Sequence, residues 1–150
     1  MWYNKVVANI GTLPDFIMYY RSELESAKKD VSVYGYVEKN LADLPGITEH
    51  RFHQLQEIEA VLNYLNIQLR KISRKHFQKY LEAYQRALTS RDAEKYVDGE
   101  DEVIEYETLI NDVALLRNQW LGIMKGLESK NFMLGNVVRL RASGMEDIQL

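Results

Sequence analysis

The stretch that decides the fold runs from Val103 to Arg141 and reads VIEYETLINDVALLRNQWLGIMKGLESKNFMLGNVVRLR. Most of its apolar residues recur at alternating steps of three and four, which is the spacing of a heptad coiled-coil seam. This pattern predicts one long helix with an apolar face along its whole length. Polar residues at some seam positions often set register or oligomeric state. The seam positions are Val103, Tyr106, Ile110, Val113, Arg117, Trp120, Met124, Leu127, Asn131, Leu134, Val138 and Arg141.

A second apolar row runs beside this seam at seven-residue intervals and contains Leu109, Leu116, Ile123 and Val137. A helix with two adjacent apolar rows should pack against more than one neighbour. We expect other copies of the chain to supply those neighbours. The alternative is a monomer in which residues 1–47 fold back over the apolar stripe. The residues expected to form the contact between copies are Trp120, Met124, Leu127, Leu134 and Val138.

A similar seam lies in the middle of the chain. From Leu55 to Ile72 the apolar residues again alternate in steps of three and four, and neither Gly nor Pro occurs in residues 47–98. Thr48 follows the helix-breaking pair Pro45-Gly46 and has the side chain of an N-cap. These features predict a very long helix that begins at Thr48.

The two long helices are separated by a turn signal at Asp98-Gly99, which precedes an acidic helix start. Acidic side chains in the first turn are favoured by the helix dipole. The sequence therefore predicts an all-α fold, a long antiparallel helical hairpin whose helices are joined near residues 89–99.

Both prolines, Pro14 and Pro45, lie in the first third of the chain. Apolar residues at helical spacing predict a short helix that includes residues 16–27. Residues 31–37 alternate like a strand, but a single short strand has no partner, so we interpret them as a loop or a corner between helices. The predicted organisation is an N-terminal arm with a short helix (1–47), a long helical hairpin (48–144) and a tail (145–150).

Composition narrows the class of protein. The chain has 150 residues, 46% hydrophobic and 27% charged, which fits one globular domain. It has no cysteine, which excludes a disulfide framework, a thiolate zinc site and a cysteine nucleophile. No apolar run approaches the roughly 18 to 20 residues that span a bilayer. We expect no membrane association and a cytoplasmic location.

The net charge of −3 hides a strongly uneven distribution. Residues 70–91, the basic segment, contain seven basic side chains and one acidic side chain, whereas residues 92–112 contain nine acidic and one basic. Basic residues in the first of these segments repeat every four positions, which places them in rows along a helix. The basic residues that we expect to contact nucleic acid are Arg70, Lys71, Arg74, Lys75 and Lys79.

Four rings are interleaved with these cations, His76, Phe77, Tyr80 and Tyr84. Cations that reach phosphates beside rings that stack on bases are the two components of single-strand binding without sequence preference. The alternative is that the rings belong to the apolar seam and the cations form a solvated face. The acidic segment could cap and solvate its helix, or it could pair with the basic segment of the same or a neighbouring chain.

No catalytic constellation is present. The chain lacks a glycine-rich phosphate loop, a nucleophile elbow and a dinucleotide fingerprint. Asp98-Gly99-Glu100-Asp101-Glu102 lacks the alternating ligands of a calcium loop. We therefore expect no enzymatic activity, no cofactor and no metal.

Three segments resemble the UvsY-like recombination mediators of T4-type phages. The strongest likeness is LESKNFMLGNVVRLR at residues 127–141. Residues 92–102, DAEKYVDGEDE, are similar to that family's acidic lead-in to its last long helix, and RKHFQKY at residues 74–80 resembles its basic and aromatic segment. The chain departs from the family pattern at Leu81-Glu82-Ala83, where the family has a glycine, and residues 1–60 show no likeness.

The resemblance implies a ring-like homo-oligomer that binds single-stranded DNA and helps to load a recombinase onto strands covered by single-strand-binding protein. It implies that Arg74, Lys75, Lys79 and Tyr80 contact DNA and that the helix from Trp120 to Val138 assembles the ring. The alternative function is a helical structural or assembly protein, such as a scaffold or packaging component, without nucleic-acid affinity.

Overall fold

The computed structural model describes residues 1–82 and 88–144, and all regular structure in these residues is helical. The predicted all-α fold with a long helical hairpin is thus confirmed. The elements in chain order are α1 (Trp2–Ala8), the 3-10 helix η1 (Ile10–Thr12), α2 (Leu13–Val31), α3 (Val37–Glu82), α4 (Ser90–Asp98) and α5 (Asp101–Ala142).

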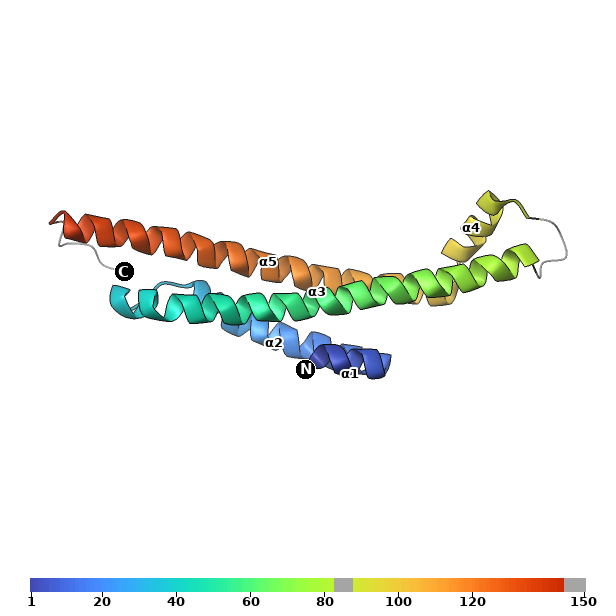
Figure 1. Ribbon diagram of the computed structural model, residues 1–150, viewed down its shortest axis with the longest axis horizontal. Coiled ribbons are helices and arrows are strands. Elements are labelled where there is room, and N and C mark those ends of the chain that lie inside the picture. Colours follow the sequence, from blue (N-terminus) through green and yellow to red (C-terminus); the bar gives the residue numbers. More distant parts are fainter. Residues whose placement is uncertain (83–87, 145–150) are drawn as a thin grey trace.

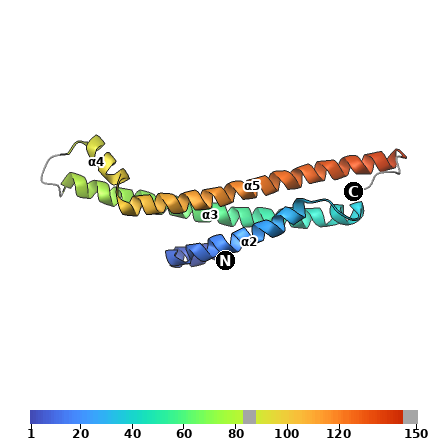
Figure 2. The same cartoon turned by 180° about the vertical axis from the view of Figure 1, so that it is seen from behind.

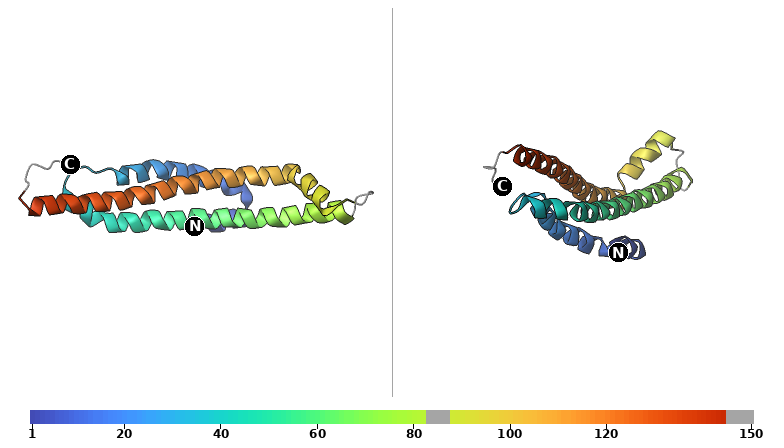
Figure 3. Two further views of the ribbon diagram at one scale, coloured as in Figure 1. Left: turned by 90° about the horizontal axis from the view of Figure 1, so that it is seen from above. Right: turned by 60° about the vertical axis from the view of Figure 1, so that its left-hand side comes forward.

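The molecule is an elongated bundle built on α3 and α5, which run antiparallel and side by side (Figure 1). Figure 2 shows α1 and α2 along one side of this hairpin, and α4 at the end where α3 finishes and α5 begins. The view from above in Figure 3 shows α3 and α5 running along most of the molecule's length. Among the described residues, no helix combines the length and the apolar character that a membrane crossing requires.

The N-terminal helices cover part of the broad apolar stripe of α5. The second-row residues Leu116, Ile123 and Val137 are buried, and α2 packs directly on α5. The Tyr20 ring of α2 meets the Trp120 ring of α5 edge to face, with centroids 5.3 Å apart. The second apolar row of α5 led us to expect more than one packing neighbour, and residues 1–31 of the same chain supply one of them.

Close approach of α2 to α5 depends on Gly126. A Cβ atom added there would lie only 2.8 Å from Cγ1 of Val31. Any larger residue would push the end of α2 away from α5.

The predicted start of the long central helix at Thr48 is wrong, because α3 begins at Val37 and continues through Pro45. Proline inside a helix removes one backbone hydrogen bond and costs about 3 kcal/mol. Here the preceding turns bury Val37 and Leu44 in the common core, and this burial offsets that cost. The boundary between residues 47 and 48 therefore falls within a continuous helix.

Two buried cations join the helices at the corner between α2 and α3. Arg51 of α3 donates hydrogen bonds to Asp30 (2.7 Å) and Glu23 (3.0 Å) of α2. Lys130 of α5 donates from Nζ to the backbone carbonyl oxygens of Asp30 (2.8 Å) and Ser32 (3.0 Å). Residues 32–36 form the corner itself, as the sequence analysis allowed.

Candidate nucleic-acid interface

The second half of α3 contains the candidate interface. All fully buried residues of α3 lie between Val37 and Leu65, and none lies in residues 66–82. Beyond Leu65 the seam residues Leu69 and Ile72 are only half-buried, because α1 and α2 do not extend over this end (Figure 1). This part of α3 therefore has a wide solvent-facing surface.

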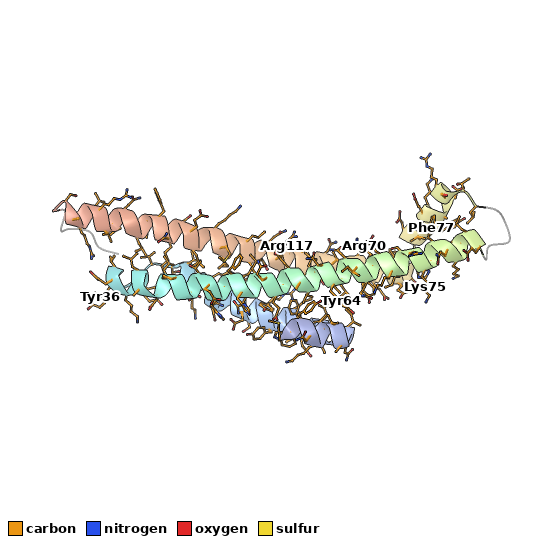
Figure 4. The ribbon with its side chains drawn as sticks, viewed as in Figure 1. Tyr36, Tyr64, Arg70, Lys75, Phe77 and Arg117 are labelled. Atoms are coloured by element: carbon orange, nitrogen blue, oxygen red, sulfur yellow. The ribbon has the colours of Figure 1, made fainter. Side chains whose placement is uncertain are left out.

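The five predicted DNA-contacting cations all lie on that surface, and we call them the basic ridge. Each one is exposed, and Figure 4 shows Arg70 and Lys75 on the part of α3 near α4. None makes an ion pair within residues 1–82 and 88–144. The basic ridge consists of Arg70 and Arg74 in one row and Lys71, Lys75 and Lys79 in the other.

The aromatic member of the predicted site, Tyr80, is engaged by neighbouring elements. Its hydroxyl group donates a hydrogen bond to a carboxylate oxygen of Glu100, and its ring stacks on that of Tyr96 with centroids 5.2 Å apart. Nζ of Lys79 lies 5.9 Å from the centre of the same ring. Tyr80 is half-buried, so it orders α4 and the start of α5 against α3.

His76 of the basic segment also contacts the acidic segment. His76 lies between two carboxylates, with Nε2 3.0 Å from Oε2 of Glu102 and Nδ1 3.7 Å from Oε1 of Glu100. The hydrogen bond from Tyr80, with the nearby His76 and Lys79, holds the pKa of the Glu100 carboxyl group below its usual value. Two further residues of the basic segment, Tyr84 and Arg86, lie outside the described residues.

Local interactions explain where α4 and α5 begin and how α4 is held. Thr89 caps α4, because its side-chain oxygen accepts a hydrogen bond from the backbone N–H of Asp92. Ala93 and Val97 are buried, and α4 packs mainly on α3. Asp101 and Glu102 occupy the first turn of α5, where the helix dipole favours acidic side chains.

The residues predicted to join copies of the chain fall into two groups. Trp120, Leu127 and Leu134 are buried within a single chain, so they need no second copy to cover them. Met124 is half-buried, and Val138 is 42% exposed. Of these five residues, only Met124 and Val138 present apolar surface to solvent.

An apolar groove lies beside this seam, between the first half of α3 and α5. It has a volume of about 750 Å³. Its lining includes Phe52, which is exposed on α3, and Leu121 and Met124 on α5. The helix α2 packs against α5 through Gly126 and the second apolar row. It does not cover the groove, so the groove is an exposed part of the broad apolar stripe of α5.

Three exposed tyrosines near the two ends of α3 are not among the site residues predicted from the sequence. The stacked partner Tyr96 was grouped only with acidic neighbours, although its place one turn before Glu100 was a usable signal. Tyr34 and Tyr36 were considered only as part of a strand-like alternation, and both are strongly exposed in the corner between α2 and α3. Their position at a helix–helix corner, away from any apolar seam, could have revealed them.

Within the described residues, no group of three His, Cys, Asp or Glu side chains is arranged to hold a metal ion. Comparison of the chain with protein-family models, with characterised proteins and with solved structures finds no match. The likeness to the mediator family therefore stays a prediction from the residues.

Proposed function

We propose that this protein is a non-catalytic, single-stranded DNA-binding recombination mediator that helps to load a recombinase onto strands covered by single-strand-binding protein. The observation that carries the proposal is the basic ridge, five exposed cations on one helix without an ion pair in the described structure. The class of activity, and a cytoplasmic location in a host cell, come from the resemblance of residues 74–80, 92–102 and 127–141 to that family.

Phosphate neutralisation is the chemistry that the basic ridge supports. Unpaired Lys and Arg side chains release condensed counterions when they contact phosphates, and this release drives binding that weakens as salt rises. The two rows of the ridge run along α3, so they can track a backbone over several nucleotides. Tyr80 supports the basic ridge indirectly, because its hydrogen bond to Glu100 and its stack on Tyr96 hold α4 and the start of α5 against α3.

The test is a salt series on the full-length protein with a fluorescent single-stranded oligonucleotide. Substituting Arg74, Lys75 and Lys79 together by Ala should weaken binding and reduce the slope of log affinity against log salt by about 2, because each phosphate contact on a single strand contributes about 0.7. A matched control replaces Lys5, Arg21 and Lys28, which are exposed cations on α1 and α2, and makes the same change in net charge. Equal slopes in the two triple variants would overturn the assignment of the ridge.

The mediator activity requires its own measurement with the same variants. We expect the wild-type protein, and the control variant, to increase recombinase binding to a strand already covered by single-strand-binding protein. The ridge variant should lose this effect in parallel with its DNA affinity. Absence of DNA binding by the wild-type protein at low salt would favour the alternative function, an assembly protein.

We also propose that copies of the chain associate through the uncovered part of the α5 seam, in which Met124 and Val138 lie. The apolar groove beside it adds Phe52 and Leu121, so the contact would bury apolar surface from both long helices. Val138→Asp should lower the mass of the particle measured by light scattering, because it would bury a charge between copies. Leu115→Asp is the control, since Leu115 is a similarly exposed leucine outside the seam. A mass unchanged by Val138→Asp would contradict this contact.

A further inference from the structure

The corner between α2 and α3 presents two aromatic rings to solvent. Tyr34 is 69% exposed and Tyr36 is 80% exposed, and no ring contact or hydrogen bond involves either side chain in the described structure. Figure 4 shows Tyr36 at the end of α3 opposite to Lys75 and Phe77. Neither ring contributes to the core, so folding alone does not account for their aromatic character.

The backbone of this corner is held in a defined shape. The side-chain amide of Asn40 donates hydrogen bonds to the carbonyl oxygens of Tyr34 (2.8 Å) and Tyr36 (2.7 Å). Gly35, between them, has a φ of +78°, which favours glycine. Buried Lys130 holds the first residue of the corner, because its Nζ donates a hydrogen bond to the carbonyl oxygen of Ser32. A fixed backbone reduces the entropy lost when exposed rings bind a partner.

Cations accompany the two rings. Lys29 and Lys39 are exposed, and both line a shallow depression of about 400 Å³ beside Tyr34 and Tyr36. Two carboxylates line the same depression: Asp30, which accepts a hydrogen bond from Arg51, and Asp43, which is exposed. The corner thus places exposed rings next to cations that can reach phosphates, the combination that binds unpaired nucleotides.

We propose that the Tyr34–Tyr36 corner is a second contact for single-stranded nucleic acid, in which the two rings stack on unpaired bases. This inference rests on the proposed function, because it adds a base-stacking contact to the phosphate contacts of the basic ridge. From Val37 to Arg74, α3 rises about 55 Å, so the two contacts lie at opposite ends of one rigid helix. A strand that engages both gains affinity from the high effective concentration of the second contact.

The test compares the wild-type protein with Tyr34→Ala/Tyr36→Ala on three ligands: a normal single strand, the same strand with abasic sites throughout, and the corresponding duplex. Stacking of bases on two rings is removed by this variant, so affinity for the normal single strand should fall by roughly thirtyfold or more. Affinity for the abasic strand and for the duplex should be the same in both proteins, because neither offers an unpaired base face. The salt slope should also stay the same, since no cation is removed.

Tyr34→Phe/Tyr36→Phe is the matched control, because it keeps the rings and removes only the hydroxyl groups. It should bind the normal strand like the wild type. If the wild-type and Ala proteins bind the normal strand equally well while the ridge variant is still defective, the base-stacking contact at the Tyr34–Tyr36 corner is overturned. The proposed function is then unaffected. Failure of the wild-type protein to bind any strand would overturn both. Circular dichroism should show that the exposed substitutions leave the helical content unchanged.

Discussion

The two halves of α3 belong to one helix and have opposite surroundings. Residues 37–65 contain all of the helix's fully buried side chains and are packed against neighbouring helices. Residues 66–82 contain none, and they carry the basic ridge. The heptad spacing continues from one half into the other through Leu69, Ile72 and His76, so the sequence pattern alone does not mark the change.

This difference separates stability from binding along a single helix. The first half is stabilised by apolar burial and by the buried network around Arg51. The second half exposes its cations, and its contacts to α4 and α5 include hydrogen bonds of His76 and Tyr80 to carboxylates. Substitutions in the first half should therefore change the free energy of unfolding, and substitutions in the second half should change ligand affinity.

Truncation of the apolar seam should show the largest difference between the halves. Leu65→Ala removes a side chain that is completely buried and should lower the free energy of unfolding by about 2 to 5 kcal/mol. Ile72→Ala, at a half-buried position of the same seam, should cost only about 1 kcal/mol. Urea denaturation followed by circular dichroism measures both. Equal losses would mean that the second half is covered in solution, for example by another copy of the chain.

A smaller effect, dependent on pH, is expected from the polar network of the first half. The hydrogen bond from Gln54 and the one from Arg51 hold the pKa of the Glu23 carboxyl group below its usual value. A carboxyl group with a lowered folded-state pKa stabilises the protein at neutral pH, and this contribution is lost as the pH falls through that pKa. Gln54→Leu should therefore lower the free energy of unfolding at neutral pH by about 1.5 kcal/mol.

The loss caused by Gln54→Leu should shrink as the pH falls below the ordinary glutamate value and through the lowered folded-state pKa of Glu23, because Glu23 then becomes protonated. Urea denaturation at a series of pH values measures this convergence. Gln56→Leu, at an exposed position of α3, is the control and should show no pH-dependent difference from the wild type. A loss for Gln54→Leu that stays constant down to low pH would contradict the role of Glu23.

The smallest effect on stability is expected for the substitution of Arg74, Lys75 and Lys79, although it should have the largest effect on DNA affinity. These side chains are exposed and without ion pairs in the described structure. Exposed positions of this kind usually change the free energy of unfolding by less than about 0.5 kcal/mol. A substantial loss of stability would show that the ridge takes part in packing and would weaken the separation between the halves.

Much of the architecture could be predicted from the residues. Repeated steps of three and four predicted both long helices, because that spacing places apolar side chains on one helical face. The turn before Asp101 and the exposed rows of Lys and Arg also agreed with the structure. The start of α3 was predicted wrongly, because the local preference of Pro45 to break a helix was outweighed by the burial of Val37 and Leu44.

The candidate sites were harder to predict, because a sequence pattern shows which side chains share a face and does not show what covers that face. Trp120 and Leu134 have the spacing of a contact between copies, yet α2 and α3 of the same chain bury them. Lys130 belongs by charge to a basic stretch, yet it is buried and holds the α2–α3 corner through backbone carbonyls.

The sequence by itself determined the all-helical character, the two long amphipathic helices and the division of charge along the chain, because these properties follow from local periodicity and composition. Only the tertiary structure decided that residues 1–31 cover one part of the hairpin and leave the basic ridge exposed. It also decided that Tyr34 and Tyr36 lie at the opposite end of α3 from that ridge. Burial depends on contacts between residues far apart in the chain, such as Tyr20 with Trp120 and Val31 with Gly126, which no local pattern encodes.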